Sequence, residues 1–417
     1  MSRRRVTVLL AAATMAIAAG LFVALPAQKP DTVSQPTPAE PTQAPAGERE
    51  AMFYEKFPDG RVQCHICPRT CVIMPGQRGF CRNRENRDGT LYSVVYGKPC
   101  TLSIEPIEKA PFNHFLPGQM RLCVATVGCN LTCKYCQNWQ ISQKPLEEVR
   151  YQEIAPADLV AQAKKSGIPI ICFTFSEPIT FYEYMYDTAK LAHEAGIKTA
   201  MVSNGYINPE PLKKLLTVMD AVKIDLKGFT PEFYRDVTGG TLDPVLETLK
   251  VVHQSGRHLE IVNLVVPTQN DDPATIRKMC QWIKDNIGVE HAIHFTRFFP
   301  MYRMTRLPAT PVSTLEGAAK IAREVGLQYV YIGNVPGHEY ESTFCPECGK
   351  RLIYRVGLNV LENKLQDGKC PYCGHKIPGV WSLDEAAADK VSQGSEGSGS
   401  GAGVPPRVRA STCRPWS

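Results

Sequence analysis

Three cysteines in one short loop constrain this chain more than any other feature. Cys129, Cys133 and Cys136 are spaced Cys-x3-Cys-x2-Cys, which lets one loop aim three thiolates at a single iron–sulfur cube. A four-iron cube with three protein ligands keeps one iron open, and open coordination is typical of chemistry rather than storage. Tyr135 is expected to present an aromatic face beside the cube, suited to stacking on a purine. A zinc site or buried apolar thiols are the alternatives.

A repeating pattern follows this loop. From Arg121 to Asn334, short apolar runs alternate with amphipathic stretches, which predicts a repeat of strand and helix. Such a repeat folds as an α/β protein, here a partial (β/α)6 TIM-like barrel with its chemistry at the carboxyl ends of the strands. The expected strands are Leu122–Val127, Pro169–Phe175, Lys198–Ser203, Ala221–Leu226, Leu259–Val266, Ala292–Phe298 and Gln328–Ile332.

Polar residues gather at the ends of these expected strands. Singly, each is better explained as a satisfied surface or core residue, but together around one cysteine loop they favour a shared pocket. They are Glu177 after the second strand, Ser203 and Asn204 at the third, Asp225 and Lys227 at the fourth, and His294 in the sixth.

Residues 62–381 resemble the radical S-adenosylmethionine (SAM) protein of the AmmeMemoRadiSam system, a branch similar to pyruvate formate-lyase activating enzymes. The stretches that carry the resemblance are Pro106-Ile107-Glu108-Lys109, Gly128-Cys129-Asn130, Cys136-Gln137-Asn138-Trp139, Ser176-Glu177-Pro178, Asp225-Leu226-Lys227-Gly228, His294-Phe295-Thr296-Arg297-Phe298 and Tyr331-Ile332-Gly333-Asn334.

The resemblance implies a [4Fe–4S] cluster on Cys129, Cys133 and Cys136, with SAM on the open iron. An electron from a low-potential donor then cleaves SAM to a 5′-deoxyadenosyl radical that abstracts hydrogen from a substrate, with proteins among the candidates. Within this resemblance Glu177 matches the acidic residue that binds the amino group of SAM. The other expected SAM-site residues are Tyr135, Ser203, Asn204, Asp225, Lys227 and His294. A Memo-like protein is the implied partner, and the residue that acts on the substrate is unknown.

Two departures from the family pattern separate this chain from the activating enzymes. Ser176 replaces a glycine beside Glu177, and the stretch Val202–Gly205 lacks the Asp that precedes Thr-Asn-Gly in those enzymes. The missing Asp argues against their cation site and against direct activation of a glycyl-radical enzyme. A glycyl-radical activase and a non-catalytic iron–sulfur or zinc redox module are the alternative functions.

Two further cysteine groups flank the repeat. Cys64, Cys67, Cys71 and Cys81 supply four thiols through tight turns, which favours a closed zinc site over a second cluster. Cys345, Cys348, Cys370 and Cys373 form two Cys-x2-Cys pairs typical of a zinc ribbon with structural Zn²⁺, and a rubredoxin-like iron site is the alternative. The stretch Glu105–Phe115, between the first group and the repeat, is expected to line the active-site mouth or to form a surface loop.

The chain's ends differ from its body. Three arginines precede an apolar run from Val6 to Leu25, which predicts membrane anchoring or export through a twin-arginine-like signal, with a cytoplasmic protein as the alternative. Any membrane contact is expected through this segment alone. The net charge of +6 is spread along the chain without a basic block, so we expect no nucleic-acid partner.

The sequence therefore predicts six segments. They are a signal peptide or membrane anchor (1–30), a Pro-rich linker (31–50), an N-terminal four-cysteine module with its lead-in (51–120), a radical SAM barrel (121–340), a zinc-ribbon-like module (341–383) and a disordered tail (384–417).

Overall fold

The computed structural model describes residue 47 and residues 49–383. The predicted N-terminal apolar run, most of the Pro-rich linker and the predicted tail lie outside these residues. Internal contacts divide the chain into Met1–Gln43 and Ala44–Ser417, and all the helices and strands of the described residues belong to the second unit. Within the described part of the chain, none of the helices combines the length and apolar character that a bilayer crossing requires.

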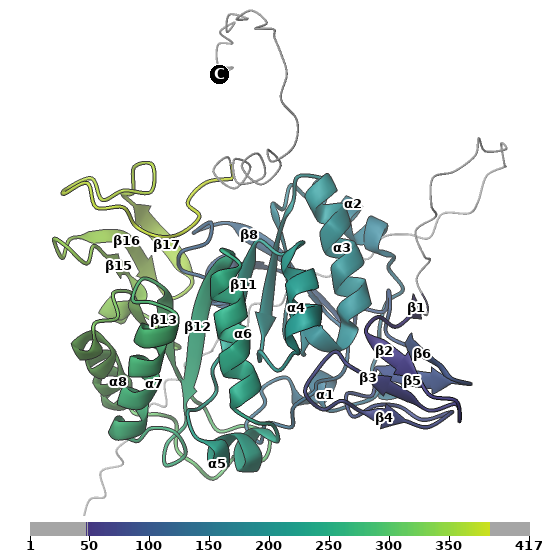
Figure 1. Ribbon diagram of the computed structural model, residues 1–417. Helices are drawn as coiled ribbons and strands as arrows, with labels where there is room; N and C mark the ends of the chain where they lie inside the picture. Colours follow the sequence, from purple (N-terminus) through teal and green to yellow (C-terminus); the bar gives the residue numbers. More distant parts are fainter. Residues whose placement is uncertain (1–46, 48, 384–417) are drawn as a thin grey trace, which may run out of the picture. The chain divides into compact units, whose positions relative to one another are not determined.

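One eight-stranded sheet forms the body of this unit (Figure 1), in the order β14-β13-β12-β11-β10-β9-β8-β7. Strands β8 to β14 are parallel and follow one another in sequence, so all seven predicted strands are confirmed. The strands are β7 (Thr101–Pro106), β8 (Met120–Ala125), β9 (Ile170–Phe173), β10 (Lys198–Ser203), β11 (Ala221–Asp225), β12 (His258–Val265), β13 (Ala292–Arg297) and β14 (Val330–Gly333).

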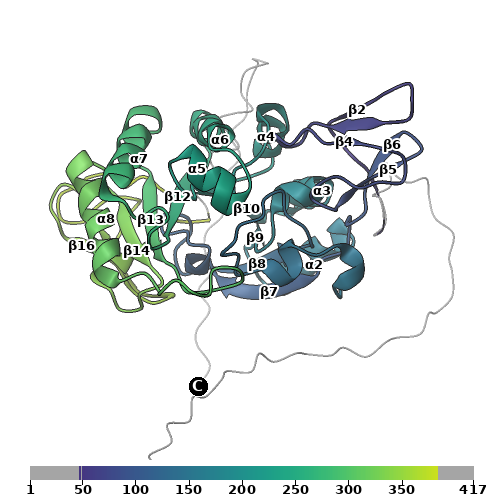
Figure 2. The same cartoon turned by 90° about the horizontal axis from the view of Figure 1, so that it is seen from below.

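Helices connect the parallel strands and follow one another around the outside of the curved sheet (Figure 2). Their apolar faces pack on the strands, whose residues are almost all buried. They are α1 (Trp139–Ser142), α2 (Pro156–Lys165), α3 (Tyr182–Glu194), α4 (Pro209–Leu216), α5 (Pro231–Phe233), α6 (Asp243–Gln254), α7 (Pro273–Asn286) and α8 (Val312–Val325). Short turns of other helix types are η1 (Ile107–Lys109), η2 (Leu146–Glu148), η3 (Pro178–Phe181), η5 (Glu339–Glu341) and the π-helical η4 (Tyr234–Thr238).

Two small modules flank the sheet at opposite ends, as both views show (Figures 1 and 2). The N-terminal module has two antiparallel three-stranded sheets, β1-β6-β5 and β2-β3-β4. The C-terminal module, beside β14, has the antiparallel sheet β15-β16-β17. The strands are β1 (Arg49–Glu50), β2 (Tyr54–Lys56), β3 (Val62–Cys64), β4 (Val72–Ile73), β5 (Arg84–Arg87), β6 (Thr90–Ser93), β15 (Thr343–Phe344), β16 (Arg351–Val356) and β17 (Asn359–Asn363).

The segment between β7 and β8 corrects one prediction. We expected Glu105–Phe115 to line the active-site mouth or to be a surface loop, but Phe112, His114 and Phe115 are buried. The backbone N–H groups of Asn113 and His114 donate to Glu260, near the amino end of β12. The segment therefore plugs the amino end of the sheet, and its charged and aromatic composition reflects a buried polar plug rather than a mouth.

Candidate active site and cysteine sites

The three-cysteine loop follows β8 and is held rigidly from several sides. The backbone N–H groups of Thr132 and Lys134 donate to carbonyls of η4 at 2.8 and 3.0 Å, and that of Gly128 donates to Ile141 at 3.0 Å. Gly128 has φ +92°, and a Cβ there would lie 2.6 Å from the carbonyl oxygen of Cys81. Only glycine fits, because the loop is pressed against the N-terminal module.

The thiols of this loop suit a metal cluster better than a single ion. Burial raises the pKa of Cys133 to about 11 and that of Cys129 well above its usual range, so each needs a strong cationic partner to ionise. Among the described residues, two groups of three or more metal-binding side chains have ligand atoms all within 4.8 Å of one another, and this loop is not one of them. Thiolates spaced this widely fit a cube in which each binds a different iron.

Glu177 lies beside the loop and joins the ends of two strands. Its carboxylate accepts from the Ser203 hydroxyl at 2.7 Å and from the Asn204 backbone N–H at 2.8 Å. The Asn204 side chain donates to Asn130 at 2.9 Å and approaches the Cys129 sulfur at 3.8 Å. Burial raises the pKa of Glu177 to about 7 despite these donors. Among the described residues Glu177 makes no direct ion pair, although the charge of Lys227 also acts on it and lowers its pKa slightly. A buried carboxylate of this kind suits a ligand ammonium.

The backbone before Glu177 is strained. Phe175 has φ +69°, in the left-handed region that an aromatic residue rarely adopts, and its carbonyl accepts from Asn138 at 2.8 Å. The hydroxyl of Ser176 is buried without a hydrogen-bond partner among the described residues. A strained turn and an unsatisfied buried hydroxyl are both typical of a ligand site.

Asp225 and Lys227 lie together at the end of β11. Asp225 accepts from Lys227 at 3.0 Å and also pairs closely with Lys223. These two ammonium groups hold the pKa of Asp225 far below its usual range, against the effect of burial. The charges of Asp225 and Lys227 act on the Cys133 thiol and that of Glu177 acts on Cys129, while Lys227 also acts on Glu177, so these three charged residues lie around the cysteine loop.

Tyr135 is buried, and its ring lies 6.4 Å from that of Phe233 at an angle of 33°. Its hydroxyl has no hydrogen-bond partner among the described residues. The ring thus packs near Phe233 in the interior, and the predicted role of Tyr135 beside SAM stays a prediction.

His294 does not join these residues. Its Nε2 lies 2.6 Å from the Glu260 carboxylate, and its ring stacks on Tyr331 with centroids 5.0 Å apart. Glu260 also binds His258 and the plug segment. The structure therefore places His294 in a buried network that reaches the amino end of the sheet, and its role in SAM binding stays a prediction.

The two outer cysteine groups differ in geometry. The sulfurs of Cys345 and Cys373 lie 3.6 Å apart and those of Cys348 and Cys370 lie 3.7 Å apart, with all four within 4.8 Å. Thiolates around one zinc ion are about 3.8 Å apart, from a Zn–S bond of about 2.3 Å in a tetrahedron. The N-terminal four, Cys64, Cys67, Cys71 and Cys81, line a single cavity but are not among the groups that close to within 4.8 Å in the described part.

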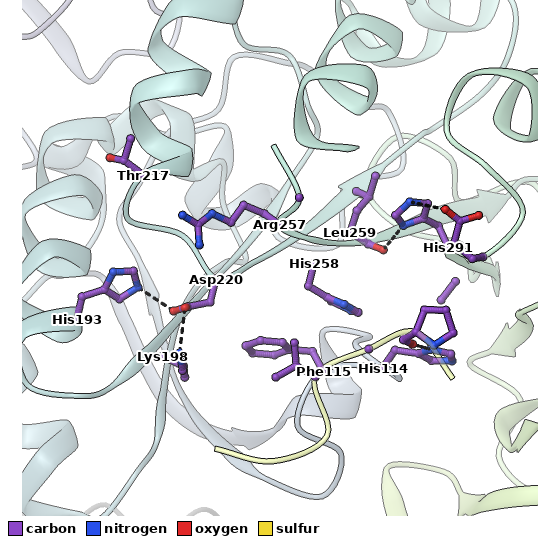
Figure 3. A pocket seen from close by; sticks show the side chains of 16 residues that line it. His114, Phe115, His193, Lys198, Thr217, Asp220, Arg257, His258, Leu259 and His291 are labelled. Carbon is purple, nitrogen blue, oxygen red and sulfur yellow. Dashed lines mark hydrogen bonds and ion pairs between the residues drawn. The ribbon is translucent and has the colours of Figure 1, made fainter. Parts of the chain in front are cut away.

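A cavity of about 530 Å³ lies at the amino ends of strands β10 to β13 (Figure 3). Asp220 accepts from His193 and Lys198 at 2.8 and 3.2 Å on one side of it, and His291 lies on the other. The plug residue Phe115 and the strand-end residue His258 also line it. This cavity is at the end of the sheet remote from the three-cysteine loop, so its size does not mark the active site.

Several site residues were not predicted from the sequence. Asn130 bridges the cysteine loop to Asn204 and to the Tyr206 carbonyl, and Lys223 is the second cation on Asp225. The Ser142 hydroxyl lies 3.2 Å from the Cys136 sulfur. Lys223 lies two residues before Asp225 on β11, so both side chains point to the same face of the sheet. The position of Lys223 could therefore have been predicted from the strand pattern.

Comparisons with known proteins agree with this geometry. The sequence model of the radical SAM superfamily matches residues 123–280. An uncharacterized protein, MJ0808, from Methanocaldococcus jannaschii is 48% identical over 331 residues, which cover 79% of this chain and 98% of that protein. A pyruvate formate-lyase-activating enzyme from Clostridium pasteurianum is 30% identical over 179 residues, covering 42% of this chain and 73% of that enzyme.

Among solved structures, that of Streptococcus suis SuiB bound to S-adenosylmethionine is similar with a TM-score of 0.42 and 14% identity, covering 58% of this chain and 56% of that one. The family match spans the three-cysteine loop and the strand ends that carry Glu177, Asn204 and Asp225. The chain therefore belongs to the radical SAM superfamily and is an enzyme of that class.

Proposed function

We propose that this enzyme cleaves SAM reductively and uses the resulting radical to abstract hydrogen from a protein substrate. The observation that carries the proposal is the meeting of three elements at the carboxyl ends of adjacent strands. The cysteine loop lies between the Glu177–Ser203–Asn204 group after β9 and β10 and the Asp225–Lys227 pair after β11.

In this proposal Cys129, Cys133 and Cys136 hold the [4Fe–4S] cluster, which supplies the electron that splits bound SAM into methionine and a 5′-deoxyadenosyl radical. Glu177 receives the SAM ammonium, because it is a buried carboxylate beside Cys129 whose described contacts are a hydroxyl and backbone N–H groups rather than a direct ion pair. Lys227 and Asp225 offer a donor and an acceptor for the carboxylate and the ribose hydroxyls of SAM. Buried Tyr135 helps to keep water from this side of the loop.

Finer assignments complete the proposal. The curved sheet acts as a partial barrel, and the four C-terminal cysteines hold a structural zinc ion. The chain works within the AmmeMemoRadiSam system, with a Memo-like protein as partner and a low-potential protein as electron donor. The N-terminal segment anchors the enzyme at a membrane or directs its export. The near-complete coverage of MJ0808 and the short similarity to activating enzymes support a branch distinct from those activases.

A direct test uses a purified Memo-like protein as substrate. The reduced holoprotein and SAM are incubated with that protein grown with deuterium in its side chains, and 5′-deoxyadenosine is analysed by mass spectrometry. We expect deuterium in the 5′-deoxyadenosine from the wild-type enzyme and none from a Cys133→Ala control. Abundant unlabelled 5′-deoxyadenosine with every deuterated protein offered would contradict a protein substrate.

A further inference from the structure

We propose that Cys64, Cys67, Cys71 and Cys81 hold a second [4Fe–4S] cluster that relays electrons to the cluster of the three-cysteine loop. The four thiols line one cavity in the N-terminal module, together with Ile66, Ile73 and Phe80. Backbone N–H groups of Ile66, Arg69 and Asn83 face three of the sulfurs. Thiols that converge on one space, most of them met by a backbone donor, form a built metal site.

The spacing of the sulfurs decides between a zinc ion and a cluster. The C-terminal cysteines of the same chain serve for comparison. Their sulfur atoms lie 3.6 and 3.7 Å apart in two pairs, and all four lie within 4.8 Å of one another. The N-terminal cysteines line a cavity without closing to within 4.8 Å in the described part of the chain. Four thiolates on one zinc would have to close in that way, whereas four thiolates on the corners of a cube are held apart by its irons and sulfides.

Arg84 in the cavity wall would give such a cluster a positive charge and an N–H donor. Arg84 is 2% exposed and lines the cavity, and its charge acts on the thiols of Cys64 and Cys81. One face of its guanidinium pairs with Glu183 at 2.7 Å, but its Nε is buried without a hydrogen-bond partner in the described residues. A buried N–H beside cluster sulfides stabilises the reduced, more negative state.

The two cysteine sites share a wall. Asn130, which directly follows Cys129, lines the N-terminal cavity. Asn83 donates to the Val127 carbonyl at 2.6 Å, and Arg69 donates to the Asn130 carbonyl at 2.6 Å. The Cys81 carbonyl lies against Gly128, where a Cβ would come within 2.6 Å of it. Both cysteine loops therefore touch through backbone, which provides a short path for an electron.

The relay step, which rests on the proposed function, transfers one electron. The N-terminal cluster in its 1+ state gives one electron to the loop cluster in its 2+ state, so the first returns to 2+ and the second becomes 1+. A low-potential one-electron protein such as flavodoxin then reduces the N-terminal cluster again. The N-terminal module thus serves as the entry point for electrons at the face of the enzyme that it covers.

Metal content tests the site, independently of any SAM chemistry. The full chain is reconstituted anaerobically and analysed for iron, sulfide and zinc beside the variants Cys67→Ala, Cys133→Ala and Cys100→Ala. We expect about eight irons and one zinc in the wild type and in Cys100→Ala, a control thiol outside the groups, and about four irons in each of the other two. About four irons with two zincs in the wild type would overturn the proposal even if a variant fails to fold.

A comparison of electron donors tests the relay. SAM cleavage is measured with dithionite, which is small and reaches the loop cluster directly, and with reduced flavodoxin. In Cys67→Ala we expect the flavodoxin-driven rate to fall about tenfold more than the dithionite-driven rate, whereas Cys100→Ala should keep the wild-type ratio. An equal fall with both donors would overturn the relay. If no protein cleaves SAM with either donor, the proposed function fails while the iron count still decides the N-terminal site.

Discussion

Glu177 is the residue whose chemistry most directly governs SAM binding in this account. Its pKa is raised to about 7 by burial, so below pH 7 the carboxyl is neutral and above it ionised. Because the SAM ammonium needs the ionised form, the SAM dissociation constant should rise by up to about tenfold per pH unit as the pH falls below 7. In Glu177→Gln this dependence should vanish and binding should weaken by about 1.5–3 kcal/mol.

Equilibrium binding of SAM to the anaerobic holoprotein across this pH range provides the measurement. Glu108→Gln is a matched control, because Glu108 is another buried carboxyl whose pKa burial raises, but it bonds Gly118 in the plug segment. Its substitution should keep the wild-type pH profile of SAM binding. A flat profile in the wild type would show that Glu177 does not bind the ammonium.

The sequence predicted that Glu177 and its neighbours share one pocket. It did not predict how far along its strand each side chain lies. Glu177, Ser203 and Asn204 could be assigned to one pocket because all three end neighbouring parallel strands. His294 looked equivalent, yet it lies mid-strand in β13 and bonds Glu260. A motif match predicts which strand a residue belongs to and which residue type it is. It does not predict how far along the sheet the side chain lies, because that depends on how neighbouring strands are staggered.

At the scale of elements, helix α3 anchors the N-terminal module. Glu183 on α3 accepts from Arg84 and from the Met52 backbone N–H, both at 2.7 Å, and this ion pair is fully buried. Glu183→Gln leaves the Arg84 charge buried and unpaired, so the free energy of unfolding should fall by about 3–5 kcal/mol. Urea denaturation measures the change.

The control for this docking pair is Asp236→Asn, since Asp236 pairs with Arg235 on the surface. That substitution should leave the unfolding transition in place. Should Glu183→Gln and Asp236→Asn shift the transition equally, the buried pair would have no special role in holding the module.

The zinc ion proposed for the C-terminal module should stabilise it more than its small core does. Leu352, Ile353 and Ile377 pack against tyrosines of β14 and its approach, and the four cysteine sulfurs close around one point. Cys348→Ser should therefore lose one zinc equivalent and become sensitive to protease after Thr343, with the iron content unchanged. Zinc analysis and limited proteolysis check this, and full zinc retention in the variant would contradict it.

Strand periodicity predicted the seven parallel strands closely, and β10 has the predicted bounds Lys198–Ser203. The antiparallel edge strand β7 was missed although Thr101–Glu105 alternates polar and apolar residues, because the run is short and ends in proline. Its apolar residue Ile104 is exposed, so the alternation does not mark a buried face. Cysteine spacing fixed the number of ligands in each group. It did not predict the distances between sulfurs, which depend on how the turns of β3 and β4 pack around the cavity.

In the molecule as a whole, a small module lies at each end of the sheet and the plug segment closes the amino ends of its strands (Figure 1). The N-terminal module and the three-cysteine loop share one wall, whereas the C-terminal module packs at the far edge of the sheet. The plug segment fills the amino ends of the strands, and the backbone N–H of Val380 donates to His114 at 2.8 Å to tie the C-terminal module to it. The proposed electron entry and SAM chemistry would therefore lie side by side at one end of the sheet, away from the C-terminal module and the plug segment.

We propose that the three-cysteine loop and its neighbours cleave SAM. The most direct measurement is 5′-deoxyadenosine formed when the anaerobically reconstituted full chain is mixed with dithionite and SAM, with Cys133→Ala and Cys100→Ala measured alongside. We predict 5′-deoxyadenosine and methionine in equal amounts from the wild type and from Cys100→Ala, and none from Cys133→Ala, which loses one of only three loop thiolates. Wild-type protein with a full iron and sulfide complement that binds SAM yet forms no 5′-deoxyadenosine would contradict the claim.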